Sequence, residues 1–176
     1  MLDIYAGENA LKTIKEHGFK QELFTNFLGA SGGPKWFVLF GLDNYLFGEF
    51  FKNRNTELNI IGSSAGAFRA ACFAQQNPLE ALSRLAKHYA ETTYTQKAQP
   101  KEITTKASRL LDEVFSTSGI KEIIENPVIK AHFIVAKSKG LTSFDNKISQ
   151  ASGLLSSYLL NKIDRRLLTL QYDRYV

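Results

Sequence analysis

Two serines stand in Gly-x-Ser-x-Gly patterns, the arrangement in which many hydrolases expose a nucleophile. One pattern spans Gly29–Gly33 (GASGG) and centres on Ser31, and the other spans Gly62–Gly66 (GSSAG) and centres on Ser64. In a nucleophile elbow the serine occupies a sharp, strained turn between a strand and a helix. Glycines flank it because a Cβ at those positions would collide across the bend. The pattern alone admits both serines, so the neighbouring sequence has to decide between them.

The sequence around Ser64 fits an elbow better than the sequence around Ser31. The run LNIIG is typical of a short buried strand, and the small-residue run SAGAFRAACFAQQ favours a helix directly after it. A helix that begins at the serine places its positive end beside developing negative charge. Ser31 instead precedes Gly-Gly-Pro, which favours a loop. We therefore predict Ser64 as the nucleophile, with Gly62 and Gly66 as the elbow glycines.

The earlier glycine-rich stretch, GASGGPK, predicts a different role. It is not a nucleotide-binding Walker A loop, because Pro34 and Trp36 stand where that motif needs a glycine and a Ser or Thr. Proline also has no N–H to offer a phosphate. The backbone N–H groups of Gly32 and Gly33 could instead stabilise an oxyanion above Ser64. A tight turn kept free of side chains for packing is the alternative.

The elements expected around these motifs alternate between strands and helices. Strands are expected over 23–29, over 57–62 and in the run VIKAHFIVAKS, and helices over 8–17, 35–51, 64–76, from 78 onward, 105–115, 119–125 and 148–160. This alternation predicts an α/β domain with a largely parallel sheet. In a parallel βαβ unit both glycine motifs emerge at the carboxyl edge of the sheet, where α/β proteins bind ligands.

The segment over 35–51 is crowded with aromatic residues. We interpret its polar side as a narrow face around Asp43, Asn44 and Glu49. Its aromatic residues either pack between the sheet and neighbouring elements or line a groove for an acyl chain, because lipid sites are largely apolar. The aromatic residues are Trp36, Phe37, Phe40, Tyr45, Phe47, Phe50 and Phe51.

Composition limits the class of protein. With 176 residues, 44% of them hydrophobic and 22% charged, the chain fits one globular domain. No run of about 18 apolar residues is present to span a membrane, and the N-terminus lacks the pattern of a secretory signal. Cys72 is a lone cysteine in an apolar run, so no internal disulfide can form. We predict a cytoplasmic protein.

The net charge of +5 is spread along the chain, without a block of basic residues or a nucleic-acid motif. An ordinary solvated surface explains it, and so does a peripheral position at an anionic membrane. No histidine, cysteine or carboxylate spacing suggests a zinc site. We therefore predict no metal, no cofactor and no nucleic-acid partner.

With its SGGPK loop (31–35) and GSSAG elbow (62–66), the chain resembles the patatin-like phospholipase family over residues 24–76. Ser31 and Trp36 replace glycines of that family's loop. The resemblance implies a three-layer α/β/α fold and hydrolysis of phospholipids or other acyl esters by a Ser-Asp dyad. The residues assigned to the oxyanion and substrate site are Gly32, Gly33, Ala65 and Lys35. Lys35 either attracts an anionic head group or is an ordinary solvated lysine.

The resemblance also implies a catalytic aspartate in a late Asp-Gly-Gly or Asp-Gly-Ala motif, and no Asp-Gly dipeptide occurs here. We therefore expect residues 1–176 to be the N-terminal part of a longer hydrolase domain, with the base beyond Val176 and LLTLQYDRYV as an element cut short. Such a fragment alone would be a poor catalyst, because Ser64 would lack its proton acceptor.

Two other functions stay open. An esterase with a Ser-Asp-His triad would need an acid and then a histidine after Ser64, an order that Asp112 and His132 satisfy. His132, however, falls in an expected strand, which favours a structural histidine. A lipid-binding or scaffold module that keeps the fold without catalysis is the other possibility.

Overall fold

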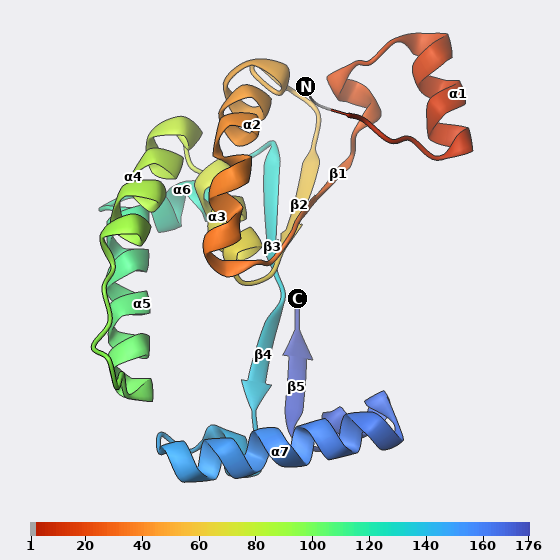
Figure 1. Cartoon of the computed structure of the whole chain (residues 1–176). Coiled ribbons are helices and arrows are strands. Elements are labelled where there is room, and N and C mark those ends of the chain that lie inside the picture. Colours follow the sequence, from red (N-terminus) through yellow and green to blue (C-terminus); the bar gives the residue numbers. More distant parts are fainter. Residues whose placement is uncertain (1–2) are drawn as a thin grey trace.

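A computed structural model describes residues 3–176 and has a mixed α/β architecture (Figure 1). Its centre is a three-stranded parallel sheet in the order β1-β2-β3, formed by β1 (Asn26–Gly29), β2 (Leu58–Gly62) and β3 (Ile129–Phe133). The parallel pairing was expected from the strand–helix alternation. β1 begins at Asn26 rather than at residue 23, because Leu23 belongs to a 3₁₀ helix, η1 (Gln21–Leu23), and β2 begins at Leu58 rather than at residue 57.

The register of the sheet aligns the two glycine motifs. Gly29, the last residue of β1, is the Cα partner of Gly62, the last residue of β2. Both motifs therefore leave the same edge of the sheet, as the sequence predicts.

The segment that connects β1 to β2 differs from the single α-helix expected over 35–51. It is wound as a 3₁₀ helix, η2 (Gly33–Leu39), then α2 (Phe40–Tyr45), then a π-helical turn, η3 (Leu46–Phe50). The changes in winding accompany aromatic packing: Trp36 stacks on Phe37 with ring centroids 4.6 Å apart, and Phe47 stacks on Phe73, the last residue of α3 (Ala65–Phe73), at 3.6 Å. Propensity predicts a helix here but not how tightly it is wound.

The first helix between β2 and β3 packs against the sheet, and the helices after it pack on that helix and on one another. α3 (Ala65–Phe73) contacts all three strands, and α4 (Pro78–Glu91), α5 (Pro100–Phe115) and α6 (Gly119–Glu125) follow it. Figure 1 shows α4 and α5 lying side by side beyond α3. The helices predicted over 8–17 and 119–125 are confirmed as α1 (Glu8–His17) and α6. α5 begins at Pro100, earlier than the helix predicted over 105–115. The main core includes Leu58, Ile60, Ala70, Cys72, Phe73, Leu82, Leu85 and Val114.

The run VIKAHFIVAKS is not one strand. Ile134 separates β3 from β4 (Val135–Ser138), which pairs antiparallel with β5 (Tyr172–Tyr175) in a second sheet. Between β4 and β5 lie η4 (Gly140–Ser143), α7 (Lys147–Ile163) and η5 (Arg165–Leu170). The C-terminal run expected as an unfinished element therefore contains a paired strand. α7 confirms the helix expected over 148–160.

The α/β class is established, but a three-layer arrangement is not evident at β1. Neighbouring residues of a strand lie on opposite faces of the sheet. Phe27 packs against the core on one face, whereas Leu28, on the other face, is 74% exposed. Within residues 3–176, none of the helices has the length and apolar character needed to cross a bilayer.

Candidate active site

Ser64 occupies a strained turn between β2 and α3. Its backbone angles are φ 51° and ψ −127°, a region that residues with side chains rarely adopt. Ser64 is the N-cap of α3 and Ala65 is its first helical residue. The Ser64 side chain is exposed, whereas Ala65 is buried. This is the strand–turn–helix geometry of a nucleophile elbow.

The glycines of this turn occupy space in which a side chain has no room. A Cβ at Gly62 would lie 2.4 Å from the carbonyl carbon and oxygen of Gly66. A Cβ at Gly66 would lie 2.1 Å from the carbonyl oxygen of Gly29. Gly66 thus packs directly on the end of β1, which brings the start of the glycine loop close to the start of α3.

The loop after β1 forms no second elbow. Ser31 is exposed and is followed by the 3₁₀ helix η2. Gly33 has a φ of 53°, which favours glycine, and the Lys35 N–H donates to the Gly32 carbonyl at 3.2 Å. The Lys35 side chain is exposed.

A cavity of about 670 Å³ opens beside Ser64. Pro34, which follows Gly33, lies in its wall together with Ser64, so the glycine loop and the elbow border one space. The remaining wall is mainly apolar and comes from η2, α3, α4, the segment after it and α5, with Phe37, Phe68, Tyr89, Tyr94, Ile103 and Leu110 as its large members. A serine hydroxyl beside an apolar cavity is suited to an ester that carries an acyl chain.

Tyr89 borders the cavity although no sequence motif indicates it. Its hydroxyl lies 3.8 Å from the position that a Cβ of Gly33 would occupy, and its ring contacts those of Trp36 and Phe37 edge-on. Burial raises the pKa of Tyr89, and the neighbouring Tyr94 raises it further, so the phenol stays protonated at neutral pH. The amphipathic pattern of α4 predicts a packed face but not which residues border a cavity.

Polar contacts fix the segment between α4 and α5 at the rim of this cavity. Glu102 accepts hydrogen bonds from the Thr95 backbone N–H (3.0 Å) and hydroxyl (2.7 Å) and pairs with Lys106 at 2.6 Å. The Lys106 hydrogen bond, together with those from Thr95, lowers the pKa of Glu102 to about 2. Lys106 also donates to the carbonyl of Thr93.

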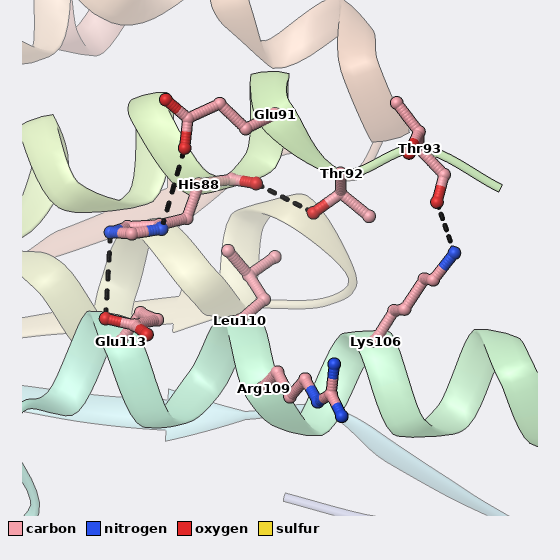
Figure 2. Close-up of a pocket in the computed structure, with 8 residues that line it drawn as sticks. All are labelled: His88, Glu91, Thr92, Thr93, Lys106, Arg109, Leu110 and Glu113. Carbon is pink, nitrogen blue, oxygen red and sulfur yellow. Dashed lines mark hydrogen bonds and ion pairs between the residues drawn. The ribbon is translucent and has the colours of Figure 1, made fainter.

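A second pocket lies between α4 and α5, and it shares Thr92, Lys106 and Leu110 with the larger cavity (Figure 2). His88 stands there between two carboxylates, 3.7 Å from Glu113 and 4.0 Å from Glu91. Across residues 3–176 no cluster of three or more histidine, cysteine or acidic side chains could hold a metal ion.

No proton acceptor for Ser64 is in place within residues 3–176, where no carboxylate or imidazole hydrogen-bonds its hydroxyl. His132 lies in β3 with its Nε2 2.9 Å from Oδ1 of Asn59, and Asp112 lies in α5. The structure therefore does not join these residues into a triad with Ser64. Cys72 is buried, and burial raises the pKa of its thiol to about 12, so it is no alternative nucleophile.

No protein-family model matches the chain, and neither a curated protein nor a solved structure matches it.

Proposed function

We propose that this protein is a serine acyl hydrolase that cleaves phospholipids or other acyl esters. One observation carries the proposal: Ser64 is held in a strained turn at the start of α3 and opens into a largely apolar cavity. Backbone strain of this kind concentrates at functional sites. The paired SGGPK and GSSAG motifs, which resemble those of patatin-like phospholipases, support the same function.

In the proposed reaction the Ser64 oxygen attacks the ester carbonyl carbon while a base takes the hydroxyl proton. The carbonyl oxygen becomes an oxyanion, which the backbone N–H groups of Ala65, Gly32 and Gly33 stabilise. Each such donor is worth about 2.7–4 kcal/mol in the transition state. The alcohol leaves with a proton, and water then releases the acyl group from Ser64. By resemblance to the family, the base is an aspartate outside residues 1–176.

The proposed setting is the cytoplasm, at the surface of anionic membranes, with no metal or cofactor. The net charge of +5 supports attraction to an anionic surface. Lys35, exposed beside the glycine loop, is the proposed contact to an anionic head group.

A fluorophosphonate probe, which reacts with activated serines, tests the proposal on the full-length protein. We expect labelling of the wild type, complete loss of labelling in Ser64→Ala, and wild-type labelling in the neighbouring control Ser63→Ala. Labelling that survives in Ser64→Ala, or a folded wild type that is never labelled, would refute the proposed nucleophile.

A non-catalytic lipid-binding module is the second candidate, favoured by the lack of a base at Ser64 within the described part of the chain. It predicts that fatty-acyl ligands bind while acyl esters are not hydrolysed. Comparing binding of a fluorescent fatty acid with ester turnover separates the two functions.

Filling the apolar cavity should change the preferred chain length of the acyl group. Ala107 lies in the cavity wall, and Ala107→Trp would occupy space that a long chain needs. We expect kcat/KM for a palmitoyl ester to fall about 10–200-fold relative to a butyryl ester. The exposed helical position Ala151 offers a control, Ala151→Trp, that should keep the wild-type ratio. An unchanged ratio in Ala107→Trp would mean that the acyl chain lies elsewhere.

A further inference from the structure

A buried ion pair connects the two segments that carry the candidate site. Arg69 of α3 donates from Nε to Oδ2 of Asp43 (2.7 Å) and from Nη2 to Oδ1 (2.5 Å). Asp43 is 0% exposed and Arg69 is 3% exposed. The sequence predicts Asp43 on a polar face, and that prediction is wrong because Asp43 is buried against a partner from a different helix.

Such a pair is a poor means of stabilising a fold. Removing both charges from water costs several kcal/mol per ion, and well-packed apolar replacements of buried pairs are often as stable or more so. Burial raises the pKa of the Asp43 carboxyl, and the hydrogen bond and charge of Arg69 counteract that rise. The bidentate geometry does fix the relative orientation of the two side chains more strictly than apolar contact would.

The positions of the two residues suggest what this orientation serves. Asp43 lies in α2, which continues from the glycine loop through η2, and Arg69 lies in the second turn of α3, just beyond Ser64. The contact of Gly66 with Gly29 already fixes the strand ends. The ion pair adds a second fixed point on the helical side, and two points set both the distance and the rotation of α3 relative to the loop.

We propose that Asp43 and Arg69 are positioning residues that hold the nucleophile helix in register with the oxyanion loop. This inference rests on the proposed function, because it assumes that Ser64 and the Gly32–Gly33 backbone act on one substrate. A displacement of about 1 Å between such groups can cost about 100-fold in rate.

The test uses the double variant Asp43→Leu/Arg69→Met, which replaces the pair with apolar groups of similar size. We expect a free energy of unfolding close to that of the wild type, an unchanged KM for a short-chain ester, and a kcat lower by about 100-fold. Arg69→Lys keeps the charge without the planar fork and should also lower kcat. The partly exposed pair Lys139–Asp173 (2.7 Å) lies at the second sheet and gives the control Lys139→Met/Asp173→Leu, which should leave kcat unchanged.

A stable double variant with wild-type kcat would overturn the proposal, because the site would then form without the pair. An unfolded double variant would also overturn it, because the pair would then serve stability. All of these variants are made in the full-length protein, and a full-length wild type that folds but neither hydrolyses esters nor reacts with the probe would instead remove the proposed function itself.

Discussion

Gly66→Ala is expected to destabilise the protein severely. The added Cβ would lie 2.1 Å from the carbonyl oxygen and 2.5 Å from the carbonyl carbon of Gly29, both backbone atoms of β1. Overpacking usually costs about 1–3 kcal/mol when side chains can move aside. Here α3 and β1 themselves would have to separate, so we expect a loss at or above the upper end of that range. Urea unfolding followed by circular dichroism measures it.

Gly41→Ala is the matched control, because Gly41 lies in α2 and a Cβ there meets nothing within 4 Å. Alanine favours a helix over glycine by about 0.5–1 kcal/mol, so this variant should be slightly more stable than the wild type. If both variants unfold at the same urea concentration, Gly66 does not pack directly against the backbone of Gly29.

Ser64→Gly is expected to produce a protein that is inactive and more stable than Ser64→Ala. Both variants lack the hydroxyl, and only alanine retains a Cβ at φ 51° and ψ −127°. Strain in such a region destabilises the alanine variant by about 1–3 kcal/mol. The extra freedom of glycine in the unfolded chain destabilises the glycine variant by roughly 0.5–1 kcal/mol, which offsets part of that difference. We therefore expect the glycine variant to exceed the alanine variant by about 1 kcal/mol in free energy of unfolding.

The neighbouring residue supplies the control for this comparison. Ser63 has no positive φ, so Ser63→Gly should be less stable than Ser63→Ala. The order of glycine and alanine should thus reverse between adjacent positions, with esterase activity lost only at Ser64. The same order at both positions would contradict the strained turn.

Features that depend on neighbouring residues could be predicted from the sequence. The turn at Ser64 follows from a β-branched run, flanking glycines and small helix formers within one short segment. The parallel pairing of β1 and β2, which brings both glycine motifs to one edge of the sheet, follows from the strand–helix–strand order.

Features that depend on distant partners could not be predicted. The end of β3 at Phe133 reflects the pairing of β4 with β5, far along the chain. The sequence assigns Asp43 to a polar face because nothing near it in the chain indicates its buried partner, Arg69 of α3. Tyr89 borders the cavity only because α4 packs beside η2 and α3, a matter of helix geometry that periodicity does not encode.

The contact between Gly29 and Gly66 also constrains how this protein can diverge in evolution. Gly29, Gly62 and Gly66 meet backbone to backbone, so a side chain at any one of them cannot be offset by shrinking another. The segment between Gly33 and Leu58 connects β1 to β2 without taking part in this contact, so its length and helical winding can change. Distant homologues should therefore share the three glycines while their connecting segments differ.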